Sequence, residues 1–71
     1  MTLHGLTERQ WLDLARRVSQ GIAVDIDADA VELLGLWPQA QRIRSGMATH
    51  EDAAQISLAF WQQMDPGEVA A

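Results

Sequence analysis

The sequence predicts an all-α fold, either a small three-helix bundle or a helical hairpin, with the middle helix kinked near Pro38. Two observations support this class. Apolar residues recur at spacings of three and four along three stretches, which is typical of helices with a buried face. Each stretch is also bounded by residues that commonly begin or end helices. We expect one small helical domain over residues 1–71, with helices at about 7–20, 28–45 and 50–64 and a frayed tail at 65–71.

The first predicted helix, 7–20, has signals at both ends. Thr7 is a suitable N-cap, and Gln10 three residues later completes a capping-box pattern. Gly21 is a favourable C-terminal stop. The apolar side chains share one arc of the helix and predict a single buried face: Trp11, Leu14, Ala15 and Val18.

Residues 22–26 predict an extended connector. They are rich in β-branched side chains, but a single strand has no partner in the rest of the chain. We therefore expect Ile22, Val24 and Ile26 to lie beneath the helices. No internal repeat is apparent along the sequence.

The second predicted helix contains a proline. Asp27 or Asp29 is the expected N-cap, and Gly46 the expected end. Pro38 removes one backbone hydrogen bond and its ring clashes with the preceding turn, which costs about 3 kcal/mol in a straight helix. Gly35 weakens the same stretch. We therefore expect a kink or break here, at which Pro38 can begin a second short helix.

The third predicted helix begins at Thr49 and ends at Met64, before a proline. Leu58 and Trp61 lie outside its core stripe and widen the apolar arc to roughly 200°. The core stripe has the usual spacing of three and four and consists of Ala53, Ile56, Phe60 and Met64.

The second helix carries a similar excess of apolar surface. Three short helices cannot surround two of their own number, so part of this surface must be exposed or covered by another chain. Large aromatic residues are also common among those that dominate binding energy. We therefore predict a protein interface formed by Leu33, Leu36, Trp37, Leu58 and Trp61.

The composition argues against several partners. Ten acidic residues and five basic ones give a formal net charge of −5, which disfavours nucleic acid and anionic membrane surfaces. No apolar run approaches the roughly 18 residues of a transmembrane helix, and no signal-peptide pattern is present at the N-terminus. The chain has no cysteine, which fits a reducing compartment. We expect a cytoplasmic protein.

Catalytic and metal-binding motifs are incomplete. Asp25, Asp27 and Asp29 match the opening of a calcium-binding loop, but the required twelfth ligand falls on Leu36. His50 has neither a nucleophile nor a second histidine placed to work with it. We therefore predict no enzyme activity, no catalytic residue, no metal ion and no cofactor.

These observations predict a non-enzymatic protein-binding module, such as an accessory subunit, adaptor or inhibitor of a larger protein. Its partner is another protein, a second copy of the chain, or both. One alternative is a small helix-turn-helix DNA-binding regulator, although the third helix lacks arginine and lysine. Another is an acidic decoy of a nucleic-acid-binding protein, acting through Asp25, Asp27, Asp29 and Glu32.

Overall fold

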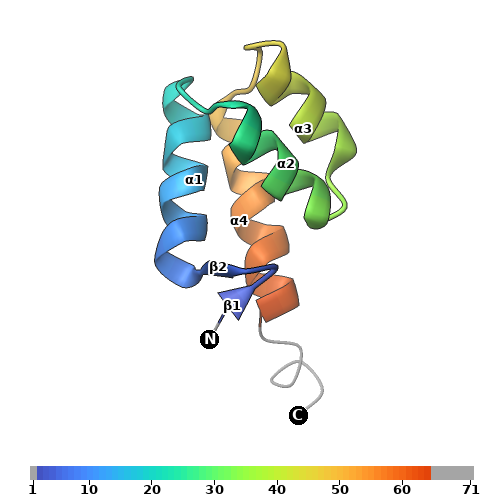
Figure 1. The fold of residues 1–71 in the computed structure, drawn as a ribbon. Coiled ribbons are helices and arrows are strands. Elements are labelled where there is room, and N and C mark those ends of the chain that lie inside the picture. The colour runs from blue at the N-terminus through green and yellow to red at the C-terminus, as the bar shows by residue number, and fades with distance from the viewer. Residues whose placement is uncertain (1, 65–71) are drawn as a thin grey trace.

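The computed structural model describes residues 2–64, so the tail expected at 65–71 lies outside the described residues. The described part contains four helices and one short antiparallel hairpin (Figure 1). A mostly helical fold is thus confirmed. Of the kink or break expected near Pro38, the structure shows a break, because two separate helices replace the single kinked middle helix. The elements are β1 (Thr2–Leu3), β2 (Leu6–Thr7), α1 (Glu8–Gln20), α2 (Asp25–Leu33), α3 (Trp37–Arg44) and α4 (His50–Met64).

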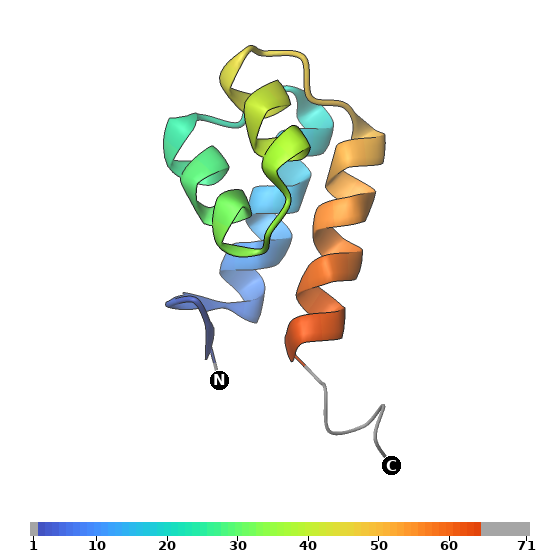
Figure 2. The same ribbon diagram turned by 90° about the vertical axis from the view of Figure 1, so that its right-hand side faces the viewer.

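The helices pack as two pairs. Helix α1 lies beside α4, and α2 lies beside α3 (Figures 1 and 2). The strands β1 and β2 lie at the end of the molecule where α1 begins and α4 ends. A single cluster of buried apolar side chains joins the pairs: Trp11, Leu14, Ala15, Val18, Ala28, Ala30, Val31, Leu34, Ala40, Ile43, Ala53, Ile56 and Phe60.

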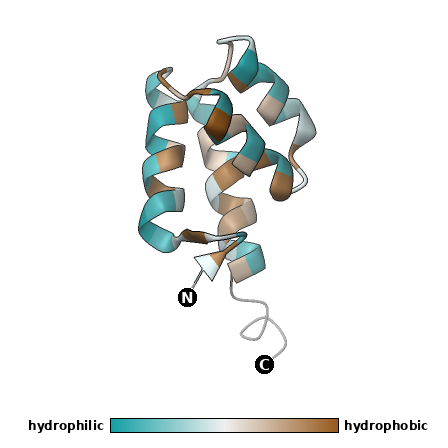
Figure 3. Ribbon diagram, in the orientation of Figure 1, coloured by the Kyte–Doolittle hydropathy of each residue, from teal (hydrophilic) through white to brown (hydrophobic). Residues whose placement is uncertain are grey.

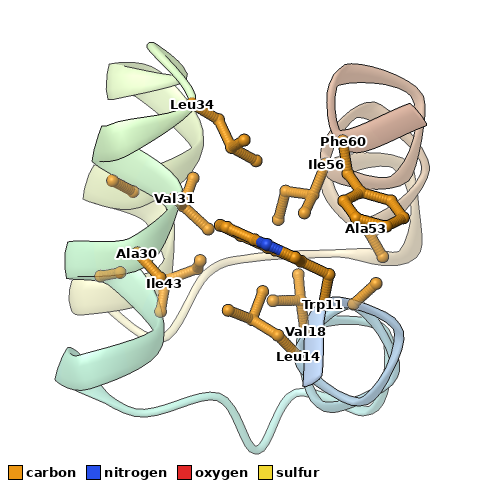
Figure 4. Close-up of a cluster of buried hydrophobic side chains, with 13 residues drawn as sticks. Trp11, Leu14, Val18, Ala30, Val31, Leu34, Ile43, Ala53, Ile56 and Phe60 are labelled. Carbon is orange, nitrogen blue, oxygen red and sulfur yellow. The ribbon is translucent and has the colours of Figure 1, made fainter. Parts of the chain in front are cut away.

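Trp11 occupies the centre of this core, as its place on the predicted buried face indicated. Its side chain is fully buried, and its ring centroid lies 6.1 Å from that of Phe60. Figure 4 shows Val31 on one side of the indole and Ile56 on the other. The indole Nε1–H donates a 2.9 Å hydrogen bond to the Leu3 carbonyl, so burial leaves its polar group satisfied.

The N-terminal hairpin was not predicted. Its turn residues, His4 and Gly5, both have positive φ, at 54° and 84°, as a two-residue type I′ turn requires. Leu3 pairs with Leu6 in the antiparallel register. Strands of two residues are too short to produce an alternating sequence pattern, and the contact from Trp11 to Leu3 supplies support that only the folded chain provides.

Helix α1 follows the sequence prediction at both ends. The Gln10 N–H donates to Thr7 Oγ1 at 3.2 Å, and the Thr7 N–H donates to Gln10 Oε1 at 2.7 Å. This is the predicted capping box. Gly21 ends the helix in the left-handed conformation, with a φ of 76°.

The predicted connector at 22–26 is wrong in two respects. Helix α2 begins at Asp25, and its N-cap is Val24 rather than Asp27 or Asp29. The Asp27 carboxylate caps the helix from inside its first turn by accepting a 3.1 Å hydrogen bond from the Val24 N–H. With the helix starting earlier, the three apolar side chains that were expected beneath the helices are exposed instead: Ile22, Val24 and Ile26.

The middle segment breaks at Gly35. Its φ of 85° lies in the left-handed region, which favours glycine and cannot continue an α-helix. Pro38 then lies in the first turn of α3, where its missing N–H costs no helical hydrogen bond. The result is a tight turn between two short helices.

The structure also reveals an internal repeat. Residues 17–28 (RVSQGIAVDIDA) and 42–53 (RIRSGMATHEDA) align without a gap, and each forms a corner between two helices. The similarity is weak in sequence, and the geometry of the corners makes it evident. The identical pairs are Arg17 and Arg42, Gly21 and Gly46, Ala23 and Ala48, Asp27 and Asp52, and Ala28 and Ala53.

The two corners have matching geometry. Gly21 and Gly46 share a φ of 76°, and each donates its N–H to the carbonyl three residues earlier at 3.1 Å. The corners also meet in space. The residues around a gap of about 10 Å³ between them fall into three equivalent pairs, which are Val18 and Ile43, Gly21 and Gly46, and Ala23 and Ala48.

Candidate interaction surfaces

Helix α4 carries an apolar stripe on its solvent side. Ala54, Leu58 and Trp61 are spaced at four and three residues, which places them on one face of the helix, and all three are exposed. Leu58 is 52% exposed and Trp61 is 47% exposed. We call these three residues the α4 outer stripe. Ala53, Ile56 and Phe60 form the buried face of the same helix, as predicted. Met64, the fourth residue of the predicted stripe, is partly buried against the core.

Trp61 lies at the boundary between this stripe and the core. Its ring centroid is 4.9 Å from that of Phe60, with the rings tilted by 58°. Phe60 in turn contacts Trp11 at the centre of the core. The Trp61 ring therefore packs against a buried side chain while about half of the residue faces solvent. A side chain that a neighbour already holds in place loses less conformational entropy on binding than a free one.

The remaining predicted contact residues lie on the α2–α3 side. Leu33 and Trp37 are each more than half exposed. Leu36 differs, because it is partly buried and packs against the core. Its position in the tight turn at Gly35 directs its side chain inward. The periodicity of a continuous helix could not predict this orientation, because the helix is interrupted at this turn.

The structure divides the predicted contact residues between two surfaces. Helices α2 and α3 lie on one side of the core, and α4 lies on another (Figure 4). Leu33 and Leu58 are both exposed, so they lie on the outer sides of helices that flank the same core. They also occupy equivalent positions beyond the end of the repeat, each six residues after the paired aspartate.

An arginine–aspartate pair holds each corner together. In the first corner, Arg17 Nε and Nη2 donate to the Asp27 carboxylate at 3.0 and 2.7 Å. Burial alone would raise the pKa of Asp27, but the hydrogen bonds from Arg17 and from the Val24 N–H outweigh it, so the pKa is lowered. Asp27 is only 4% exposed and is therefore a structural carboxylate.

The second corner repeats this arrangement. Arg42 Nε donates to both oxygens of Asp52 at 2.9 Å, and the Thr49 N–H donates to Asp52 Oδ2 at 3.1 Å. The hydrogen bonds from Arg42 lower the pKa of Asp52 despite its burial. Asp52 is as buried as Asp27.

The acidic residues on α2 do not form a metal-binding loop. Asp25, Asp27 and Asp29 lie along a helix, where the looped geometry of a calcium site is not available. Arg44 donates to both Asp29 and Glu32, which ties α3 to α2. Among the described residues, no cluster of three or more histidines, aspartates or glutamates is placed to hold a metal ion.

The exposed apolar side chains of α4 and of α2 differ in the charged residues that surround them. From Ala53 to Met64, α4 contains no charged residue. Helix α2 instead places Asp25 and Asp29 beside its exposed Ile26 and Leu33. Figure 3 shows hydrophobic segments at both ends of α2 and along the middle of α4.

No protein-family model matches the chain, and comparisons with curated proteins and with solved structures found no match. Within residues 2–64, none of the helices combines the length and apolar character needed to cross a membrane.

Proposed function

We propose that this chain is a non-enzymatic protein-binding module that contacts another protein, or a second copy of itself, through exposed apolar side chains. The observation that carries the proposal is the α4 outer stripe. Ala54, Leu58 and Trp61 form an uncharged apolar face on a helix whose opposite face already fills the core. When a helix has two apolar faces and the rest of the chain covers only one of them, the other face is available to a partner.

The second surface supports the same class of function. Leu33 and Trp37 add exposed apolar area on the α2–α3 side. An accessory subunit, an adaptor or an inhibitor each needs such an area, and an adaptor needs two. Tryptophan is enriched among residues that dominate binding energy, which favours Trp37 and Trp61 as anchors.

The two alternatives receive less support. A DNA-binding regulator would present α4 to the major groove, yet its first turn carries Glu51 and the arginine-paired Asp52, and its outer stripe is apolar. An acidic decoy would need free carboxylates on α2. Asp27 is buried against Arg17, and Asp29 and Glu32 are paired with Arg44, so only Asp25 of the four predicted residues lies outside these pairs.

Site-specific photocrosslinking in the source cells tests the proposal. A photoreactive phenylalanine analogue at position 58 should give a discrete crosslinked species. The same analogue at Ser19, an exposed position on α1, is the matched control. A band at position 58 that persists with Trp61→Ser in the same chain, or that also appears at position 19, would contradict a specific role for the stripe.

Sedimentation equilibrium then separates self-association from binding to another protein. If the partner is a second copy, the wild-type chain should dimerise, and Leu58→Ser together with Trp61→Ser should make it monomeric. A wild-type monomer with a crosslinked species of different mass indicates a hetero-partner.

A further inference from the structure

A cleft opens between α1 and α2 above the N-terminal hairpin. Its volume is about 370 Å³. Leu6 of β2 and Ile26 of α2 form apolar parts of its wall, and the buried Leu14 and Ala30 face it from the core.

Ile26 is the most exposed of the large apolar residues in the described part of the chain, at 76%. Ile26, Ala30 and Leu33 are spaced at four and three residues, so they form one stripe along α2. The stripe therefore continues from the cleft wall to the predicted contact residue Leu33. Contact between water and exposed aliphatic surface is unfavourable, so burying this surface against a partner would stabilise the complex.

Carboxylates border the apolar stripe on both sides. On one side, Asp13 and Asp27 line the cleft together with Arg17, whose charge the Asp27 pair already neutralises. Asp13 contacts Arg16 only at 3.7 Å, between two exposed side chains, which contributes little. On the other side, Asp25 and Asp29 are four residues apart and lie next to the stripe on α2. Asp29 also forms an ion pair with Arg44.

From this geometry we infer that the α1–α2 cleft receives an apolar side chain from a basic segment of a partner protein. The apolar side chain lies against Leu6, Ile26 and Ala30. Arginine or lysine residues flanking it pair with Asp13 and Asp25 at the two borders. The complementary charges set the orientation of the segment and speed its association.

This cleft is a different surface from the α4 outer stripe, and the inference stands or fails independently of it. The occupant is a protein segment because the apolar area extends from the cleft along α2 to Leu33, beyond the reach of a small molecule in the cleft. A small apolar amine is the competing occupant, since it would need only the cleft and Asp13.

The test uses the full chain, ¹⁵N-labelled, and two synthetic helical peptides. One peptide carries a leucine stripe bordered by arginines, and the other has glutamates in place of the arginines. Amide shifts should move at Leu6, Gln10 and Ala30 with the arginine peptide, and the glutamate peptide should not bind. Equal binding of both peptides, or shifts centred on Leu58 and Trp61, would overturn the inference.

Three single variants test which residues contribute to the affinity for the arginine peptide. Ile26→Ser should lower this affinity about tenfold, because burial of part of an isoleucine is lost. Asp13→Asn should weaken it about threefold at low salt. Ile22→Ser, an equally simple change at an exposed isoleucine outside the cleft lining, should leave affinity unchanged. An equal effect of Ile22→Ser and Ile26→Ser would contradict the site.

Tryptamine, a small apolar cation, is the competing probe. Under the inference it binds at least tenfold more weakly than the arginine peptide, because it leaves Leu33 uncovered and pairs with one border only. If tryptamine saturates the cleft while neither peptide binds, the cleft is a small-amine site and the protein-segment inference is wrong.

Discussion

The Arg17 guanidinium and the Asp27 carboxylate form two hydrogen bonds, at 3.0 and 2.7 Å, that join the last turn of α1 to the first turn of α2. The same carboxylate caps α2 through the Val24 N–H. One side chain therefore fixes both where the second helix begins and how it lies against the first. Asp52 has the same two roles at the corner between α3 and α4.

Removing either arginine should destabilise the fold. Arg17→Met leaves a buried carboxylate with one backbone donor, so we expect it to lower the free energy of unfolding by about 2 kcal/mol, a value below that of a fully buried pair because Arg17 is partly exposed. Arg42→Met should lower the free energy of unfolding in the same direction. Urea denaturation followed by circular dichroism measures it. The control, Arg16→Met, should change the free energy by less than about 0.5 kcal/mol, and equal losses in all three variants would contradict a specific role for the pairs.

Stability should fall in acid. The pKa values of Asp27 and Asp52 are lowered below the ordinary value for aspartate, so both carboxylates bind protons more weakly in the folded chain than in the unfolded one. Their contribution is complete above the unfolded pKa and is lost as the pH falls through the lower folded pKa. Thermal midpoints should be level near neutrality and drop below about pH 4.

The control for this pH dependence is the double variant Asp27→Asn, Asp52→Asn. It should be less stable at neutral pH and show a flatter acid branch. A wild-type midpoint that stays constant down to about pH 2 would show that neither carboxylate is stabilised as proposed.

The sign of the stability change caused by Gly35→Ala shows whether residue 35 lies in a turn or in a continuous helix. A Cβ at Gly35 meets no atom within 4 Å, so only the backbone conformation matters. Because Gly35 has a φ of 85°, alanine at this position should destabilise the fold by about 1 kcal/mol. In a continuous helix the same substitution would stabilise the fold by about 1 kcal/mol. Gly35→Asn should cost less than alanine, since asparagine tolerates this region better. Chemical denaturation of the three proteins decides between the two structures.

Trp11 and Trp37 should differ sharply in their contribution to stability. Trp11→Phe loses buried volume and the hydrogen bond to Leu3, so we expect a loss of about 2–3 kcal/mol. Trp37→Phe changes an exposed side chain and should cost less than about 0.5 kcal/mol. Thermal denaturation by circular dichroism compares them without relying on tryptophan fluorescence. Similar losses in both variants would be inconsistent with the core described above.

The candidate surfaces were only partly predictable. Leu58 and Trp61 could be identified because they lie outside a regular core stripe on an uninterrupted helix. Ile26 could not, because its exposure depends on α2 beginning at Asp25, and that start is set by a contact with Arg17 in another helix. The inward position of Leu36 likewise depends on the turn at Gly35.

Local signals in the sequence determined the helical class, the capping box at Thr7, the stop at Gly21 and the burial of Trp11, since each depends on residues within a turn or two of one another. Tertiary structure decided the number of helices, the hairpin at residues 2–7 and the pairing of the corners. These depend on contacts between residues distant in the chain, such as the hydrogen bond from Trp11 to Leu3. Helix periodicity specifies which side chains share a face, but the choice of face to bury is made only when another helix packs against it.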